Sequence, residues 1–296
     1  MSPSALALVV LAGLIHAIWN IAAKKAGGDA RFAAFTGFVM MLFWAPLGLW
    51  LGWKQLPDWG AAEWSLLCTS SVLHTFYYVI LLRGYRNADL TVVYPLARGS
   101  GPLLSSTIAI LFLGERLTPL GALGIAGVVL GVFLIAGGPR LWRAAAAADD
   151  PERARRVRVG LGYGLLTGVF IAAYTVVDGY SVKFLLMSPI LLDYFGSWLR
   201  TALLVPALLS DRKAAAAMWK KQWKYALVVG IISPISYVLV LYAMQTAPLS
   251  HVAPAREVSM LFAALIGGQL LGEGDRLPRL VGAALIAAGV MSLALG

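Results

Sequence analysis

The sequence has 296 residues, of which 60% are hydrophobic and 13% charged, and its formal net charge is +10. Soluble domains carry roughly 25% charged and about 45–50% apolar residues, so this composition excludes a soluble globular protein and predicts an integral membrane protein. The positive charge does not indicate nucleic-acid binding, because most basic residues stand in short stretches between long apolar segments, where they determine membrane topology.

Apolar stretches long enough to cross a membrane recur along the whole chain. A helix that crosses the hydrocarbon core needs about 20 mainly apolar residues, and the alternation typical of a β-barrel is missing. The predicted helical spans are ten: 4–23, 32–53, 62–82, 89–112, 118–137, 159–180, 188–209, 224–245, 249–271 and 277–295. The first is predicted to be a retained span and not a signal peptide, because its basic pair, Lys24 and Lys25, follows the apolar stretch.

Two spans near the start of the chain repeat one arrangement of polar and aromatic residues. The spacing i, i+3, i+4 puts each set on one helix face. The sets are His16, Trp19 and Asn20 in the first span, and His74, Tyr77 and Tyr78 in the third. We expect them to form a cavity wall that offers stacking surfaces and hydrogen bonds, with packing and an interfacial aromatic belt as the alternative. Two histidines suggest a metal site, but no third ligand has matching spacing, so no metal is expected.

Charges inside the fourth and ninth spans are the sharpest signal, since each costs roughly 2.5–3.5 kcal/mol at the bilayer centre on insertion scales. Arg98 and Glu257 lie at similar depths in spans that enter from opposite sides, so we expect them to meet near the middle. One interpretation makes Arg98 the anchor of a substrate carboxylate and Glu257 a site of proton coupling. The other makes them a structural ion pair that joins the halves, with Arg256 as another partner of Glu257.

Further candidates for the cavity come from the fourth, sixth and eighth spans. Tyr94 shares the helix face of Arg98, where Pro95 and Pro102 either free carbonyl groups toward a cavity or simply kink the helix. Tyr174 lies on a polar stripe that ends at Asp178, and Asp178 either faces the cavity or lies at the membrane interface. Tyr237 is the candidate from the eighth span.

The chain echoes itself on either side of a polar, arginine-rich linker at 138–158. Residues 89–134 resemble residues 248–293, so we predict two repeats of five helices, 1–137 and 159–296. An odd number of helices forces the second repeat to insert upside down. In the fifth span, Gly124, Gly127 and Gly131 include a GxxxG spacing, which permits close helix packing either within the chain or in a dimer.

The distribution of Lys and Arg agrees with this inversion. Most of them follow the odd-numbered spans, whereas the loops after the even-numbered spans hold only Lys54, Arg116 and Lys183. By the positive-inside rule both termini face outward, and we expect a multi-pass protein of a cell membrane, the bacterial inner membrane. Inverted repeats are typical of secondary transporters, because two mirrored halves allow similar states open to opposite sides.

Residues 113–118, Leu-Gly-Glu-Arg-Leu-Thr, resemble the EamA domain of the drug/metabolite transporter superfamily, and Leu271-Gly272-Glu273 repeats the signature before the last span, followed by an insertion of Gly274 and Asp275. The resemblance implies an all-α integral membrane fold of ten transmembrane helices, as two inverted five-helix repeats around a central cavity. It also implies substrates such as amino acids, other metabolites or drugs, often exported. Glu115 and Glu273 lie at span ends, where we expect them to cap or orient the following helix.

These features predict a secondary transporter that moves a small organic solute, an amino acid or related metabolite, by alternating access as its halves rock, most simply as an exporter. The alternatives are a membrane scaffold or channel-like protein, and an importer of anionic metabolites. An enzyme is not expected, since no Walker loop, HExxH motif or nucleophile–base pair is found, and no cofactor is expected. The expected partners are the solute and membrane lipid, with proton coupling, as a monomer or homodimer.

Overall fold

The computed structural model describes residues 1–88, 90–136, 151–271 and 276–296, and within these ranges every regular element is a helix. The signature at Gly272-Glu273, the insertion after it, most of the linker, and the side chains of Thr91 and Pro95 lie outside the described residues. The elements in chain order are α1 (Pro3–Ala26), α2 (Ala30–Phe43), α3 (Ala45–Gln55), η1 (Leu56–Asp58), α4 (Ala61–Asn87), α5 (Leu90–Phe112), α6 (Pro119–Ile135), α8 (Pro151–Lys183), α9 (Pro189–Leu209), α10 (Arg212–Thr246), α11 (Leu249–Ala255), α12 (Val258–Leu271) and α13 (Arg276–Leu295).

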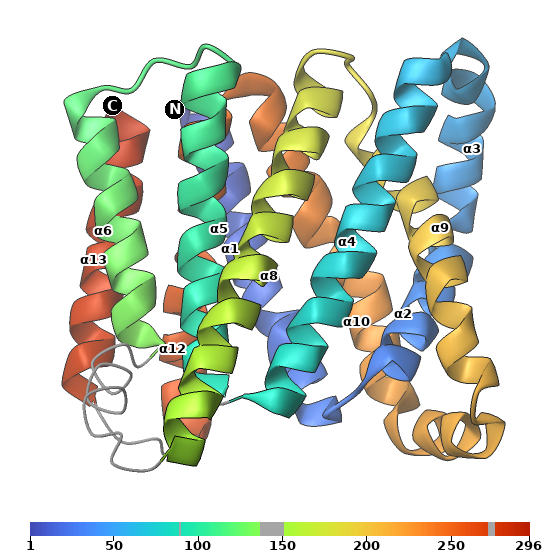
Figure 1. The fold of residues 1–296 in the computed structure, drawn as a ribbon. Helices are drawn as coiled ribbons and strands as arrows, with labels where there is room; N and C mark the ends of the chain where they lie inside the picture. Colours follow the sequence, from blue (N-terminus) through green and yellow to red (C-terminus); the bar gives the residue numbers. More distant parts are fainter. Residues whose placement is uncertain (89, 137–150, 272–275) are drawn as a thin grey trace.

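The helices stand side by side and run alternately up and down, with both termini at one end of the bundle (Figure 1). The amino group of Met1 donates to the carbonyl of Ala294 over 2.8 Å, which ties the two termini together. We call this the terminal end. The opposite end is the basic end, where α1 and α4 finish and α10 begins with Arg212 and Lys213. The first helices of the two halves, α1 and α8, run in opposite directions (Figure 1).

Four of the described helices are long and apolar enough to cross a membrane: α1, α4, α8 and α10. The count rises to five when the bent pair α2 and α3 is taken as one span. Two apolar helical segments are shorter than these spans: Pro119–Ile135, which is α6, and Leu280–Leu295, which forms most of α13. Large apolar side chains such as Leu42, Trp53 and Phe112 are exposed on the outside, as a lipid environment requires. The number of ten membrane-crossing segments therefore stays a prediction.

Two of the predicted continuous spans are broken. The span predicted at 32–53 bends by 68° at Trp44, where α2 ends and α3 begins with a proline in its first turn. The span predicted at 249–271 breaks at Arg256 and Glu257, between α11 and α12. Pro254 explains this second break, because a proline inside a helix lacks the N–H that would bond to the carbonyl four residues earlier.

Two helices extend beyond their predicted starts. Helix α8 begins at Pro151, so residues 151–158 of the predicted linker are helical. Helix α10 begins at Arg212 and not at 224, with Asp211 accepting a hydrogen bond from the Ala214 N–H over 3.0 Å as its N-cap. A search for apolar spans misses the first part of α10. Residues 213–217 are one lysine and four alanines, which favour a helix but do not form an apolar membrane span.

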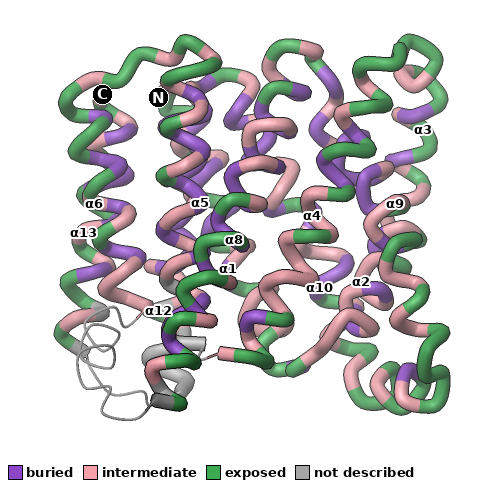
Figure 2. Tube along the Cα trace, viewed as in Figure 1, coloured by how far each residue is buried: buried purple, intermediate pink, exposed green. Residues whose placement is uncertain are grey.

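The two halves of the chain interlace, since α1 packs on α10, and α4 and α5 pack on α8. Buried residues follow the contacts between helices, and exposed residues lie on the outer faces and at the ends (Figure 2). Helices α6 and α13 form the closest pair: a Cβ atom added at Gly131 would lie 2.6 Å from the carbonyl oxygen of Gly282. The glycine stripe of the predicted GxxxG spacing therefore packs within the chain.

Candidate functional site

A cavity of about 380 Å³ lies between a wall formed by α1 and α10 and a wall formed by α4 and α8. Helices α2 and α9 close its side. Its lining combines aromatic rings, hydroxyl groups and one pair of charges. Those polar and aromatic residues are His16, Trp19, Phe32, Thr36, His74, Thr75, Tyr77, Tyr78, Tyr174, Asp193, Ser197, Arg200, Thr201, Ser233, Ser236 and Tyr237.

The cavity reaches the basic end of the bundle. Its lining includes Gly28, in the turn between α1 and α2, together with Ala23 and Ala33 on either side of that turn. Among the described residues that line it, none comes from the connections at the terminal end between α5 and α6, α8 and α9, or α10 and α11. Among the described residues, the lining therefore extends to the basic end and does not reach these connections at the terminal end.

Aromatic rings from α1, α4 and α8 line the cavity. The rings of His74 and Tyr174 stack with their centres 3.8 Å apart, and Tyr77 meets Tyr174 edge-on at 5.6 Å. On the opposite wall, His16 and Trp19 lie 4.6 Å apart. The indole N–H of Trp19 is buried and has no hydrogen-bond partner within the described part of the chain. The site thus offers flat apolar surfaces and one unused donor, which suits a small organic molecule with a planar group and an acceptor.

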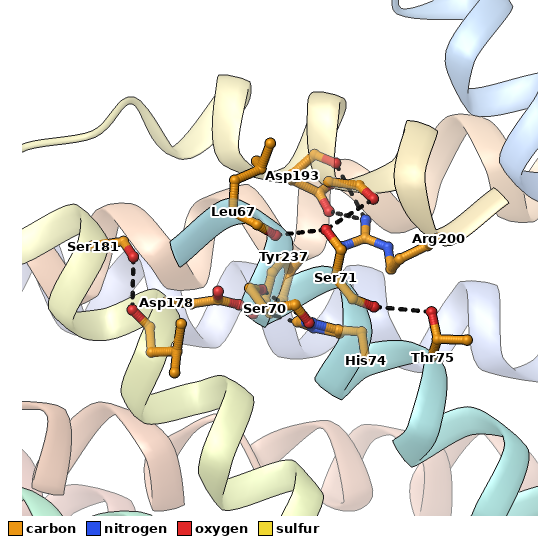
Figure 3. A network of polar contacts seen from close by, with 12 residues as sticks. Leu67, Ser70, Ser71, His74, Thr75, Asp178, Ser181, Asp193, Arg200 and Tyr237 are labelled. Atoms are coloured by element: carbon orange, nitrogen blue, oxygen red, sulfur yellow. Dashed lines mark hydrogen bonds and ion pairs between the residues drawn. The ribbon is translucent and has the colours of Figure 1, made fainter. Parts of the chain in front are cut away.

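A polar cluster joins the two walls beside the cavity (Figure 3). The hydroxyl group of Tyr237 on α10 donates to Asp178 Oδ2 on α8. His74 Nδ1 lies 2.9 Å from the backbone oxygen of Ser70, and since a carbonyl only accepts, this nitrogen carries the proton. The other nitrogen, Nε2, then faces Asp178 Oδ2 at 3.9 Å. Asp178 is buried inside the bundle and is not among the residues that line the cavity.

The pair of charges in the lining was missed by the sequence interpretation. Arg200 donates to Asp193 Oδ1 over 2.7 Å, and both residues belong to α9. Their separation of seven residues is two helical turns, so the sequence itself places them on one face of the seventh predicted span. The criterion that selected Arg98, a charge inside an apolar span, applies equally to this pair.

Arg98 and Glu257 do meet, but in a helix contact beside the cavity. Arg98 Nη2 lies 2.7 Å from Glu257 Oε2, and Glu257 is 1% exposed. Arg98 also donates to Ser259 Oγ over 3.2 Å, and Arg256 Nε lies 3.7 Å from Glu257 Oε1. These contacts join α5 to the break between α11 and α12.

Further polar contacts run along this same boundary. Tyr94 donates its hydroxyl proton toward Met260 Sδ over 3.2 Å. Ser106 donates to the backbone oxygen of Ser250 over 3.0 Å. That oxygen is the acceptor that Pro254 leaves without its helical donor, so the α5 side chain satisfies the broken helix.

The predicted residues thus separate into two groups. Most of them line the cavity: His16, Trp19, His74, Tyr77, Tyr78, Tyr174 and Tyr237. Others form the α5 boundary with α11 and α12: Tyr94, Arg98, Arg256 and Glu257. Asn20 is half-buried on α1 and belongs to neither group. No cluster of three metal-ligating side chains occurs in the described ranges.

The sequence suggested that Glu115 caps or orients the helix that follows it, but the structure gives the cap of that helix to another residue. Thr118 caps α6, accepting from the Gly121 N–H over 2.9 Å. Glu115 instead accepts from the backbone N–H groups of Leu249 and Ser250, over 2.7 and 2.8 Å, at the start of α11. Capping by a residue distant in sequence escapes any local motif.

Glu115 lies in the loop between α5 and α6 at the terminal end. Burial raises the pKa of its carboxyl group, but the N–H groups of Ser250 and Leu249 and the ammonium group of Lys183 outweigh burial and bring the pKa below the usual 4.5. The carboxylate is therefore the form that the fold stabilises.

Comparison with known proteins supplies the family. The sequence model of the EamA-like transporter family matches residues 3–137 and 158–295, which span almost the whole chain in two copies. A solved crystal structure shares the fold with a TM-score of 0.75 at 16% sequence identity, covering 100% of this chain and 98% of that chain. No curated protein sequence matches the chain.

Proposed function

The chain belongs to the EamA-like transporter family of the drug/metabolite transporter superfamily, a family of multi-pass membrane proteins that transport small solutes. From this premise we propose that it is a secondary transporter of a small organic solute, most simply an exporter, that works by alternating access in the bacterial inner membrane. Ten membrane-crossing segments in two inverted repeats, 1–137 and 159–296, would provide the two mirrored states.

The cavity is the observation that carries this proposal. It has the size and the aromatic lining of a small-molecule site. It also carries a guanidinium group, Arg200, held by Asp193. Among the described residues, its lining extends to the basic end and not to the connections at the terminal end, which supports a transporter over a channel, since a channel needs a continuous path.

The end to which the cavity extends identifies the state of the proposed transport cycle. The positive-inside rule puts the basic end in the cytoplasm and both termini outside. A cavity that extends toward the cytoplasm corresponds to the state in which an exporter loads its solute and an importer releases it. The moving parts are then the α1–α10 wall and the α4–α8 wall. Each wall combines helices of both repeats, which supports rocking of these mixed walls as a second possibility beside the expected rocking of intact halves.

We assign solute contacts to the cavity residues, with Arg200 and the Trp19 N–H as the polar anchors. For Arg98 and Glu257 we propose the structural role: they form an ion pair that holds α5 against α11 and α12. Proton coupling through Glu257 stays open to one test: a Glu257→Gln variant that still accumulates solute in response to a pH gradient removes it.

A thermal-shift screen of the purified protein tests the proposal first. Amino acids, nucleosides, organic acids and cationic drugs are added in turn, because a ligand that binds the folded state raises its apparent stability with concentration. A stabilising compound is then measured for transport into proteoliposomes. We expect Arg200→Gln to remove both stabilisation and transport, and the exposed Arg212→Gln to retain both. If no class stabilises folded protein and none is transported, the proposal fails in favour of a membrane scaffold.

A further inference from the structure

Helices α8 and α10 face each other across the cavity and come together above it, toward the terminal end. Three side-chain hydrogen bonds follow this contact one above another. The hydroxyl group of Tyr237 donates to Asp178, Gln245 Nε2 donates to the backbone oxygen of Val182 over 3.4 Å, and Lys183 Nζ donates to the backbone oxygen of Ala247 over 3.2 Å. We call these bonds the α8–α10 seam.

The bond of the seam nearest the cavity, between Tyr237 and Asp178, lies at the edge of the cavity toward the terminal end. Tyr237 lines the cavity, and Tyr174, one turn before Asp178 on α8, lines it from the opposite wall. Below this level the two helices are separated by the cavity, and above it they are joined. A path from the cavity toward the terminal end that runs between α8 and α10 therefore requires that the seam open.

Glu115 fastens the outer end of the seam. Its Oε1 atom lies 3.1 Å from Lys183 Nζ and accepts the Leu249 N–H, while its Oε2 atom accepts the Ser250 N–H. One carboxylate, 8% exposed, thus holds the end of α8 and the start of α11, which follows α10 directly. It reaches them from the loop between α5 and α6, in the other repeat.

Charge explains why this carboxylate holds the seam so firmly. Lys183 donates both to Glu115 and to Ala247, so its ammonium group is fixed between α8 and the α10–α11 turn. Hydrogen bonds that involve an ionised group are roughly twice as strong as neutral ones. Without the carboxylate, Lys183 retains a single neutral acceptor among these contacts, and two backbone N–H groups of α11 lose their partner.

We propose that the α8–α10 seam is the gate on the terminal side of the cavity and that Glu115 is its latch. The proposal rests on the alternating access proposed above, in which the cavity must open in turn at each end. In the structure described, the contacts of the latch are formed and the cavity extends to the basic end. Opening the terminal side separates Tyr237 from Asp178 and releases Lys183 and the start of α11 from Glu115.

Distances between spin labels test the gate without any solute. Cys68 is the only cysteine, so labels are placed by Phe184→Cys and Thr246→Cys in a Cys68→Ser background. Phe184 directly follows α8 and Thr246 is the last residue of α10, so both positions lie at the outer end of the seam. We expect one short distance in the parent protein. Glu115→Gln should raise the fraction of longer distances about tenfold, the effect of losing one charge-assisted hydrogen bond. Lys183→Met should act in the same direction.

The matched control is Glu63→Gln. The carboxylate of Glu63, also at the terminal end, accepts a hydrogen bond from the backbone N–H of Gly60 over 2.8 Å. This contact lies at the start of its own helix, so the substitution should leave the distances between the labels unchanged. A second readout is the Met244→Cys thiol. Met244 is buried on α10 against Gly179 of α8, so a membrane-impermeant maleimide should reach this position only when the gate opens.

The outcomes are distinct. If Glu115→Gln and Lys183→Met, both folded by gel filtration, keep the single short distance and an unreactive Met244→Cys thiol, the latch is refuted. Since no solute is present, that result leaves the proposed transport untouched. Conversely, a seam that opens in these variants supports the latch even where the solute screen finds no substrate.

Discussion

The ion pair between α5 and α11–α12 makes an asymmetric prediction. Glu257 is the common partner of two guanidinium groups, with Arg98 at 2.7 Å and Arg256 at 3.7 Å. Glu257→Gln leaves both positive charges in place without their carboxylate, whereas Arg98→Gln leaves Glu257 with Arg256. Although the two substitutions break the same ion pair, we expect the first to destabilise the protein more.

The magnitude follows from burial and distance. Unit charges about 4 Å apart attract by about 4 kcal/mol at an effective dielectric constant of ~20. Removing one partner of a buried pair costs about 3–5 kcal/mol, because the other charge stays buried and unpaired. Glu257→Gln should therefore lower the free energy of unfolding by about 3–5 kcal/mol. Arg98→Gln should lower it by about 1–3 kcal/mol, the cost of a lost hydrogen bond to a charged group.

Unfolding by SDS in mixed micelles measures both values, and the double variant closes a thermodynamic cycle. We expect the double variant to be more stable than Glu257→Gln alone or close to it, with a coupling of roughly 1–3 kcal/mol. Additive effects would show that the pair contributes no coupling. An Arg98→Gln variant that is less stable than Glu257→Gln would refute the role assigned to Arg256.

Three further predictions concern the helix packing, the cavity and the loop at the terminal end. Gly131→Val puts a side chain into the α13 backbone and should abolish the folded peak in gel filtration, whereas Gly162→Ala, where an added Cβ meets nothing within 4 Å, should not. Trp19→Phe keeps an aromatic ring but removes the unused donor, so it should weaken solute binding about three- to tenfold in thermal-shift titrations; unchanged binding would remove Trp19 as a polar anchor. The pKa of Glu115 is lowered by folding, so its contribution to stability is present above the ordinary value of 4.5 and is lost as the pH falls through the lower folded value. Melting curves should show this acid loss in the parent protein and a smaller one in Glu115→Gln, and equal losses would contradict the assignment.

The sequence by itself determined the class of protein and the approximate positions of most helices, but not the breaks near Trp44 and Glu257 or the early starts of α8 and α10. Membrane helices can be recognised in a sequence because each must be apolar along its own length, which is a property of consecutive residues. The wall residues His16, Trp19, His74 and Tyr77 were also predictable, since helical spacing puts each set on one face. Charges inside spans pointed to Arg98 and Glu257, and the same criterion, applied to the seventh span, reaches Asp193 and Arg200.

Only the tertiary structure decided which of these residues share a cavity. Arg98 and Glu257 satisfy each other in a helix contact, whereas Arg200 lines the cavity, and nothing in either sequence neighbourhood distinguishes the two cases. The cap that Glu115 gives to α11 joins residues more than a hundred positions apart. Local sequence fixes which groups need a partner, because buried charges and helix ends must be satisfied, but the partner is chosen by the packing of helices far apart along the chain.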